Sequence, residues 1–247
     1  MNPHRHPRLP GIARRVGLTI AIAGTLVLVT TTGAYAAVSG TVNTSGGALT
    51  VRAAPGTNFD AWTTKADGSG VSILCQTDGT SVTGTYGTTS LWDMLANGGF
   101  VSDAYIFTGS DGQVAPSCNY VGAPPRANPR GINAAISYEF ARLGSTAEEG
   151  LCMHFQAVAY GWSASGWATA EVGGDWETSH GYMHTSGIPP RGALVWYHNS
   201  EGTGHVVVSL GQGKIIGSSV GGQVGVDDYL YRTGYRGWSQ PYLPAAS

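Results

Sequence analysis

A cysteine and a histidine of this sequence have surroundings that suit nucleophilic catalysis. Cys152 follows Gly150-Leu151 and opens a stretch whose apolar residues recur at helical spacing, so we expect it at the start of a helix. The unpaired N–H groups and the positive dipole end found there stabilise a thiolate, which lowers the pKa of the thiol, and can donate to an oxyanion. His205 follows a glycine-rich turn and precedes the valines 206–208, so it should lie at the end of a strand, where an imidazole can take the thiol proton. The two residues predict amide cleavage with Cys152 as nucleophile and His205 as its base.

The cysteine count bears on whether Cys152 is free to react. The chain has three cysteines, Cys75, Cys118 and Cys152, and an odd count in an oxidising compartment marks one thiol as special. A disulfide between Cys75 and Cys118 would close a loop of about 40 residues and leave Cys152 unpaired. The alternative interpretations are that Cys152 is an inert buried thiol and that His205 serves only the structure.

Patterns around these two residues indicate an α+β layout for residues 132–247. Apolar residues recur at helical spacing over residues 132–143, and a second helix is expected to begin near Gly150. Residues 162–192 are rich in loop-forming residues, and three strands are expected after them, at 193–197, 205–210 and 214–218. Helices followed by an antiparallel sheet are typical of an α+β domain.

Residues 37–118 favour a different architecture, a small all-β barrel. Turn residues at short intervals separate the strands expected there, at 49–52, 71–75, 81–86 and 99–106. Residues 119–131 contain Pro124-Pro125 and Pro129, which stiffen and extend a chain, so they are predicted to be a linker. The chain is therefore expected to have two domains, residues 37–118 and 132–247.

The first 36 residues have the layout of a secretory signal peptide. Four arginines and no acidic residue lie within residues 1–15, an apolar run follows from residue 16 to 29, and Ala34-Tyr35-Ala36 fits the cleavage rule. The apolar run is too short to span a membrane. Without residues 1–36, nine basic residues remain beside fifteen acidic ones, a balance that does not suit nucleic-acid binding. We therefore expect a secreted or cell-wall-associated protein that binds neither nucleic acid nor membrane.

Residues 132–244 resemble the NlpC-type cell-wall cysteine peptidases, which are papain-like and related to the CHAP amidases. Four stretches carry the resemblance in the family's order: Gly150-Leu151-Cys152-Met153-His154-Phe155, Pro190-Arg191-Gly192-Ala193-Leu194-Val195-Trp196-Tyr197, Gly204-His205-Val206-Val207-Val208-Ser209-Leu210-Gly211-Gln212-Gly213-Lys214 and Tyr235-Arg236-Gly237-Trp238. The resemblance implies a papain-like domain that hydrolyses an amide of the peptidoglycan peptide through an acyl-enzyme.

Residues 38–110 resemble the bacterial Src-homology-3-like domain. The resemblance rests on Leu49-Thr50-Val51-Arg52 with Pro55-Gly56, on the strand that contains Cys75, and on Trp92 before Gly99-Phe100-Val101-Ser102. In that family such domains often tether hydrolases to the cell wall. It implies that residues 37–118 bind the wall or position the catalytic domain, with the alternative that they only space or shield it.

The third catalytic position departs from the NlpC-type pattern. Many family members carry a polar residue that orients the imidazole near the end of the strand after the Gly-x-Gly turn, whereas this chain has Ile216-Gly217-Ser218-Ser219 there. The resemblance implies Ser218 as the third catalytic residue, with Ser219 or the more distant Asp227 as alternatives. A Cys–His pair can act without a third group, since that group mainly fixes the tautomer.

The remaining candidates are aromatic residues and two histidines. Trp162, Trp176 and Trp196 are predicted to line a substrate groove, or else to fill the core. His180 and His184 have the spacing of metal ligands on a helix, but Gly181 weakens a helix and the general-base Glu is missing, so we interpret this stretch as a loop over the site. We expect a monomer with no metal or cofactor. Two other functions stay open, a catalytically degraded wall- or partner-binding protein and a secreted cysteine enzyme that acts on protein amides.

Overall fold

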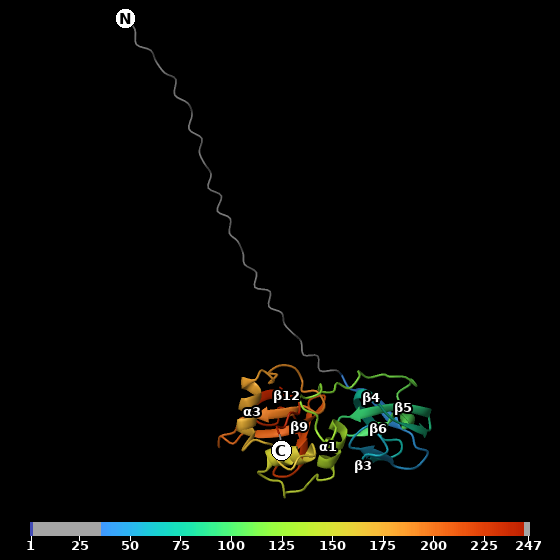
Figure 1. The fold of residues 1–247 in the computed structure, drawn as a ribbon. Helices are drawn as coiled ribbons and strands as arrows, with labels where there is room; N and C mark the ends of the chain where they lie inside the picture. Colours follow the sequence, from blue (N-terminus) through green and yellow to red (C-terminus); the bar gives the residue numbers. More distant parts are fainter. Residues whose placement is uncertain (2–35, 245–247) are drawn as a thin grey trace. The chain divides into compact units, whose positions relative to one another are not determined.

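The computed structural model describes residue 1 and residues 36–244, which contain two antiparallel sheets and three α-helices (Figure 1). Residues 2–35, which hold nearly all of the predicted signal peptide, lie outside the described residues. No helix among the described residues is long and apolar enough to cross a membrane. The chain from residue 36 onward falls within one compact unit, so the two sheets are described together.

The first sheet has seven strands in the order β3-β2-β6-β5-β4-β1-β7. They are β1 (Val38–Val42), β2 (Leu49–Arg52), β3 (Ala61–Lys65), β4 (Gly70–Gly84), β5 (Gly87–Leu95), β6 (Phe100–Ser102) and β7 (Ile106–Phe107), with a 3₁₀ turn at Asp103–Tyr105. The strand expected at 49–52 is confirmed. The strand expected at 71–75 and residues 81–84 of the one expected at 81–86 are parts of the single long strand β4, and residues 85–86 form its turn into β5. The strand expected at 99–106 is divided into β6, the 3₁₀ turn and β7.

The second sheet has five strands in the order β11-β10-β9-β8-β12. They are β8 (Leu194–Tyr197), β9 (His205–Gly211), β10 (Lys214–Gly217), β11 (Gly225–Asp228) and β12 (Tyr235–Ser239). The helices α1 (Ile132–Phe140), α2 (Cys152–Ala159) and α3 (Ala170–Ser179) precede this sheet in the chain. The helix expected at 132–143, the helix start near residue 150 and the three expected strands are therefore confirmed to within a few residues, and β11 and β12 are additional.

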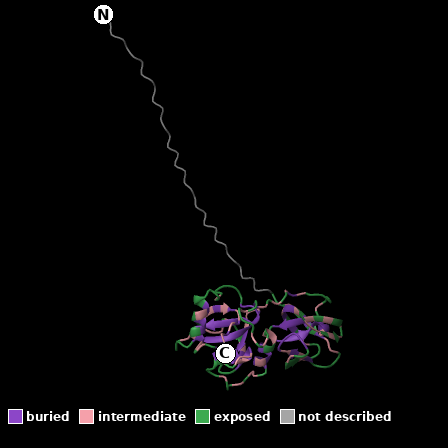
Figure 2. Cartoon of the chain, in the orientation of Figure 1, coloured by how far each residue is buried: buried purple, intermediate pink, exposed green. Residues whose placement is uncertain are grey.

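Both faces of the second sheet are covered, as the buried strands in Figure 2 indicate. Alternate residues of β8 and β9 point to opposite faces. One set joins the core under the helices, namely Leu194, Trp196, Val206, Val208 and Leu210. The other set packs with a group of tyrosines from the β11–β12 segment, namely Val195, Tyr197 and Val207 with Tyr229, Tyr231 and Tyr235. A strand buried on both faces reads as a continuous apolar run, which is why residues 206–208 are three valines.

One hydrophobic core runs from the first sheet into the second. Trp92, Met94 and Phe100 belong to the same buried cluster as Phe140 and Leu210. The rings of Trp62 and Phe140 lie 4.7 Å apart. A polar contact accompanies this packing, since Ser137 Oγ donates to Asp60 Oδ2 at 2.8 Å. Residues far apart in the sequence therefore stabilise one another across the segment predicted to be a linker.

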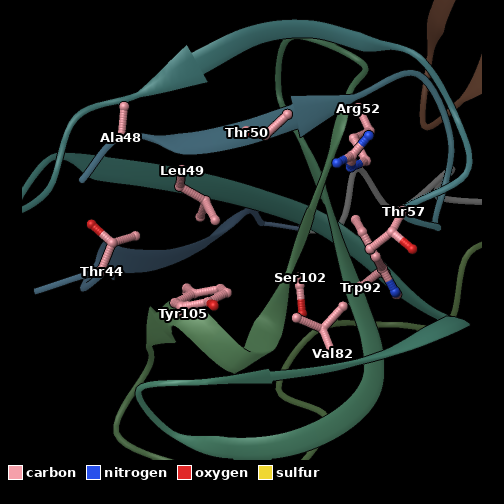
Figure 3. A pocket seen from close by; sticks show the side chains of 10 residues that line it. All are labelled: Thr44, Ala48, Leu49, Thr50, Arg52, Thr57, Val82, Trp92, Ser102 and Tyr105. Carbon is pink, nitrogen blue, oxygen red and sulfur yellow. The ribbon is translucent and has the colours of Figure 1, made fainter.

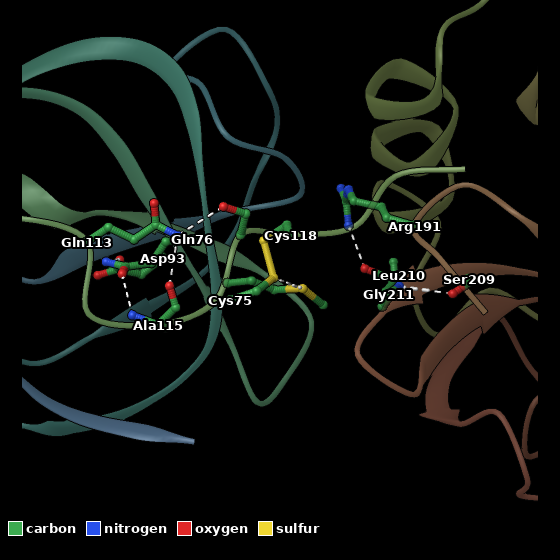
Figure 4. The surroundings of a disulfide bond; sticks show 12 residues. Cys75, Gln76, Asp93, Gln113, Ala115, Cys118, Arg191, Ser209, Leu210 and Gly211 are labelled. Carbon is green, nitrogen blue, oxygen red and sulfur yellow. Dashed lines mark hydrogen bonds between the residues drawn. A yellow bond between two sulfur atoms is a disulfide. The ribbon is translucent and has the colours of Figure 1, made fainter. Parts of the chain in front are cut away.

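The fully buried Arg191 joins the two sheets by hydrogen bonds. Its guanidinium donates to the carbonyl of Ala53 at 3.0 Å and to the carbonyl of Leu210 at 3.3 Å, and lies 4.8 Å from the centre of the Phe100 ring. Figure 4 shows Arg191 beside Leu210. Its Nε donates to Asn133 Oδ1 at 3.3 Å. Backbone carbonyls and an amide therefore replace the water that this charge loses on burial.

The helix α3 lies within residues 162–192, which were predicted to be rich in loops and for which no helix was expected. Gly173 and Gly174 argue against a helix in the sequence, because glycine is a poor helix former. The structure needs both: a Cβ at Gly173 would lie 2.9 Å from the rings of Trp167 and Trp196, and one at Gly174 would lie 2.7 Å from the Arg236 guanidinium. Thr169 caps the helix by accepting a hydrogen bond from the N–H of Val172. Close packing and a side-chain cap therefore outweigh the low helix propensity.

The structure contains the disulfide between Cys75 and Cys118 and leaves Cys152 as a free thiol (Figure 4). Cys75 is fully buried on β4, and Cys118 lies 43 residues further along the chain. Closing a loop of this length lowers the entropy of the unfolded chain. The double variant Cys75→Ala/Cys118→Ala should therefore lose about 4 kcal/mol of unfolding free energy, measured by urea denaturation. Cys152→Ala serves as the control, and equal denaturation midpoints for the double variant and the wild type would contradict the prediction.

Candidate active site

Cys152 is the first residue of α2. Leu151 is the N-cap residue and no side chain caps this end, so the first N–H groups of the helix have no intrahelical partner. Gly150 has a φ of +74°, a left-handed conformation that a residue with a side chain rarely adopts. Its N–H donates to Ser219 Oγ at 3.0 Å, which ties this turn to the loop after β10. The expected position of Cys152 at a helix start is confirmed.

His205 is the first residue of β9 and is 3% exposed. The turn before it is held by Asn199, whose Oδ1 accepts hydrogen bonds from the N–H groups of Thr203 and Gly204, both at 3.0 Å. Gly204 has a φ of +68°, and a Cβ there would lie 2.5 Å from the backbone N of Glu171. A glycine and an asparagine therefore set the direction in which the chain enters β9, and with it the position of the imidazole.

Cys152 and His205 line the same cavity, which has a volume of about 590 Å³. Residues from five segments complete the wall, namely Glu149, Gly150, Leu151, Met153, His154, Ala168, Thr169, Ala170, Asn199, Glu201, Thr203, Gly204, Ser219 and Arg232. Among the described residues no hydrogen bond joins Cys152 Sγ to His205. Such bonds often tighten only when substrate is bound. The cavity is large enough for several residues of a peptide.

The electrostatics of the pair differ from the expectation drawn from the helix start. Burial raises the pKa of the Cys152 thiol, although the N–H groups of Val206 and Met153 and the Arg232 guanidinium each lower it. Burial, together with Arg232, lowers the pKa of His205 to about 3. The predicted low thiol pKa is therefore wrong for the free protein, because desolvation outweighs the donors at the helix start. At neutral pH the pair consists of a thiol and an uncharged imidazole.

Alkylation by iodoacetamide should report this state, because only the thiolate reacts. A raised pKa leaves less thiolate at any given pH, so the reaction should be slow at pH 6–7 and should accelerate above pH 9, where the ordinary thiol is already ionised. The measurement is mass spectrometry of the alkylated protein over a pH series, with Cys152→Ala as the unreactive control. Complete and rapid labelling at pH 6 would mean that Cys152 is a thiolate in the free protein.

The residues considered for the third catalytic position lie in different surroundings. Ser218 is fully buried, its Oγ and His205 Nε2 both lack a hydrogen-bond partner among the described residues, and Ser218 does not line the cavity. Ser219 lines the cavity, with a left-handed φ of 56°, and holds Gly150. Asp227 is exposed and accepts from the N–H of Asp228. Orientation of the imidazole by Ser218 therefore stays a prediction.

The predicted aromatic groove is not part of this cavity. Trp196 is fully buried and donates to Ser239 Oγ at 2.9 Å, so it cannot line a groove, and the alternative that it fills the core holds for this residue. Trp162 donates to Asn128 Oδ1 at 2.8 Å, and Trp176 stacks on His180 with ring centres 4.0 Å apart. None of the three tryptophans lines the cavity.

The two candidate metal-ligating histidines are both engaged with aromatic rings. His180 stacks on Trp176, and His184 stacks on Trp238 with ring centres 4.1 Å apart. Within residues 36–244 no group of three or more His, Cys, Asp or Glu side chains is arranged to hold a metal ion. The stretch follows the end of α3 and does not line the cavity.

The sequence analysis did not identify Arg232 and Tyr231 as site residues. Both lie in the loop between β11 and β12. Arg232 lines the cavity and lowers the pKa of Cys152, which burial raises. Burial also raises the pKa of Tyr231, which Arg232 lowers and the charge of Cys152 raises further. No spacing rule joins residue 232 to residues 152 and 205, so only the pairing of β11 and β12 into the sheet could have revealed it.

A second, smaller cavity of about 280 Å³ lies among the strands of the seven-stranded sheet (Figure 3). Its wall includes Arg52, Trp92 and Tyr105. Their polar groups already bond within the chain: Arg52 to the carbonyl of Phe59, Trp92 to that of Thr80 and Tyr105 to that of Thr83. Its wall contains hydroxyl groups but no cysteine, histidine or carboxylate, whereas Cys152 and His205 both line the larger cavity.

Two proteins of Bacillus subtilis are similar to part of this chain in sequence. No family model matches the chain. The uncharacterized protein YraI of Bacillus subtilis (strain 168) is 44% identical over 112 residues, which are 42% of this chain and 92% of YraI. The uncharacterized protein YraJ of the same organism is 44% identical over 88 residues, 32% of this chain and 75% of YraJ.

Solved structures of NlpC and NlpC/P60 proteins are the structural neighbours. NlpC2 and NlpC1 from Trichomonas vaginalis give TM-scores of 0.33 and 0.30 at 17% and 18% identity, over 83% of this chain and 97% and 95% of theirs. An NlpC/P60 family protein from Bacillus cereus ATCC 10987 gives a TM-score of 0.32 at 15% identity, and the match spans 84% of this chain but only 64% of that protein.

The sequence identity to YraI, 44%, is far higher and extends over 92% of YraI. The chain therefore belongs to the YraI family through the 42% of its length that aligns.

Proposed function

We propose that the protein is a secreted peptidoglycan hydrolase that cleaves an amide bond of the wall peptide with Cys152 as nucleophile and His205 as base. The observation that carries the proposal is the cavity of about 590 Å³ whose wall contains both a free thiol at a helix start and a buried imidazole at a strand start. The four stretches that resemble the NlpC-type peptidases contain both residues. The substrate class comes from that resemblance.

The reaction proceeds in two displacements. As Cys152 Sγ bonds to the amide carbonyl carbon, its proton passes to the uncharged imidazole of His205, whose pKa is about 3 in the free protein. This transfer requires that the negative charge developing beside the imidazole raise that pKa. The N–H groups at the start of α2 donate to the oxyanion. The C–N bond then breaks, the imidazolium returns the proton to the leaving amine, and a thioester remains. Water, deprotonated by His205, attacks the thioester and releases a carboxylic acid and the free thiol.

The burial of the pair fits a reaction that starts from neutral groups. An uncharged thiol and imidazole need no counter-ions in the free protein. Charge develops only as the carbonyl accepts the sulfur, when the N–H groups of Met153 and Val206 and the Arg232 guanidinium oppose the cost of the negative charge. Ser218 is proposed to steady the imidazole, and the seven-stranded sheet, as a Src-homology-3-like module, to bind the wall.

A second candidate function is a wall- or partner-binding protein that has lost catalysis. Two observations favour it: the pKa of Cys152 is raised, and His205 Nε2 has no hydrogen-bond partner among the described residues. Cleavage of protein amides by the same pair is a third. These functions differ in whether Cys152 is needed and in which amide is cut.

The test is incubation of the purified mature protein with peptidoglycan sacculi, followed by mass spectrometry of the soluble fragments. Cys152→Ala is the matched control, because it removes only the sulfur from a residue at the cavity wall. Fragments released by the wild type alone would support the proposal, and their new termini would distinguish a peptidase from an amidase. Equal release by both proteins, or no release by a folded wild type with Cys152 reduced, would overturn it.

A further inference from the structure

Arg232 brings an unpaired positive charge to the wall of the catalytic cavity. It lies in the loop between β11 and β12 and lines the cavity together with Cys152 and His205. The carbon of its guanidinium is 5.9 Å from the ring centres of both Tyr197 and Tyr231. The imidazole of His205 is 5.9 Å from the same Tyr197 ring. The cation is therefore beside the predicted reacting groups and is held against aromatic rings.

No carboxylate of the described chain neutralises Arg232. The ion pairs within residues 36–244 do not include it, whereas the neighbouring Arg236 contacts Asp175 at 2.6 Å and Glu171 at 3.2 Å. The carboxylates of Glu149 and Glu201 line the same cavity but lie beyond ion-pair distance of Arg232. Arg232 is partly exposed, so its donors can meet a molecule that enters. A guanidinium presents a planar set of donors that matches a carboxylate in two parallel hydrogen bonds.

Besides Arg232, one further feature of the cavity wall favours a negatively charged group near the nucleophile, whereas Glu149 and Glu201 oppose one elsewhere in the wall. The uncapped N-terminus of α2 lies in the wall at Cys152. Its positive dipole end favours an anion, although the N–H groups there are needed for the oxyanion. A carboxylate of the substrate would therefore find its strongest partner in Arg232 and not in the helix.

We propose that Arg232 is a specificity-determining residue that binds a free carboxylate of the substrate next to the amide that is cut. The proposal rests on the proposed function for the identity of the cavity as the reaction site. It restricts the substrates to wall peptides whose carboxyl group at that position is free, and it excludes those in which the same group is a carboxamide.

A binding measurement tests the role of Arg232 independently of whether the protein cleaves the substrate. Soluble peptide fragments are prepared from sacculi in two forms, with free carboxyl groups and with carboxyl groups converted to carboxamides by carbodiimide and ammonia. Each form is titrated by calorimetry into Cys152→Ala and into Cys152→Ala/Arg232→Gln, because without the thiol the fragments stay intact. A Cys152→Ala/Arg126→Gln protein is the matched control, since Arg126 is exposed and does not line the cavity.

We expect Cys152→Ala to bind the free-carboxylate fragments about 10–100-fold more tightly than the carboxamides, and Arg232→Gln to abolish the preference while Arg126→Gln retains it. Equal binding of the two forms by Cys152→Ala would overturn the role of Arg232 and leave the hydrolase proposal to the sacculus assay. A preference that depends on Arg232 in a protein that cleaves no sacculi would support Arg232 and overturn the hydrolase. Absence of both binding and cleavage would overturn both proposals.

Discussion

Replacement of His205 by alanine should lower the rate of amide cleavage about 10²–10⁴-fold, the loss typical of a missing general base. The variant removes the group that accepts the thiol proton and returns it to the leaving amine. His154→Ala is the matched control, because His154 also lines the cavity but is exposed and follows the nucleophile on the same helix. Steady-state rates on soluble wall peptides give the comparison, and urea denaturation shows whether both variants are folded. A His205→Ala protein with the activity of the wild type would exclude His205 as the base.

The pH profile adds a readout that a structural role of His205 would not produce. The imidazole must be uncharged to accept a proton, and its pKa is lowered to about 3 by burial and by Arg232. Protonation of the base therefore removes activity only as the pH falls towards that value. The ratio kcat/KM should not fall between pH 7 and pH 5, where an ordinary histidine would become charged. An acidic limb centred near pH 6.5 would show that the imidazole is solvated in the working enzyme.

Replacement of Arg191 by alanine should lower the free energy of unfolding by about 3–5 kcal/mol. The change leaves a cavity against Phe100 and removes the donor from the buried carbonyls of Ala53 and Leu210. Urea denaturation measures the loss, with Arg126→Ala as an exposed arginine control. Arg191→Met separates the two causes, because methionine restores most of the volume but no donor. An unfolding free energy within 1 kcal/mol of the wild type for Arg191→Ala would mean that the two sheets do not depend on this residue.

Much of the site's scaffold was predictable because it depends on local chemistry. Glycine and apolar spacing located the start of α2 at Cys152, and the valine run located β9 after His205. The disulfide between Cys75 and Cys118 was one of three possible pairings, and it was favoured because it leaves Cys152 free to act as a nucleophile. The helix start and the strand start depend only on residues that are neighbours in the sequence.

Features that depend on distant contacts were not predictable from the sequence. The raised pKa of Cys152 comes from burial under residues remote in the chain, and α3 is stable because Trp167, Trp196 and Arg236 pack on its glycines. Trp196 was predicted to line a substrate groove, but its strand β8 is buried on both faces. Arg232 reaches the cavity only through the pairing of β11 with β10 and of β12 with β8.

The core shared by the two sheets limits how residues 132–244 can be separated from the first sheet and joined to another domain. Leu210 belongs to the second sheet, yet a Cβ on Gly98, which lies between β5 and β6 of the first sheet, would lie 2.6 Å from its Cδ1. Phe140 of α1 likewise packs against a residue of the first sheet, the Trp62 ring. Residues 132–244 without the first sheet would leave these apolar side chains in water. A chimera of residues 132–244 with another domain would therefore need new side chains at the contact that the first sheet now fills.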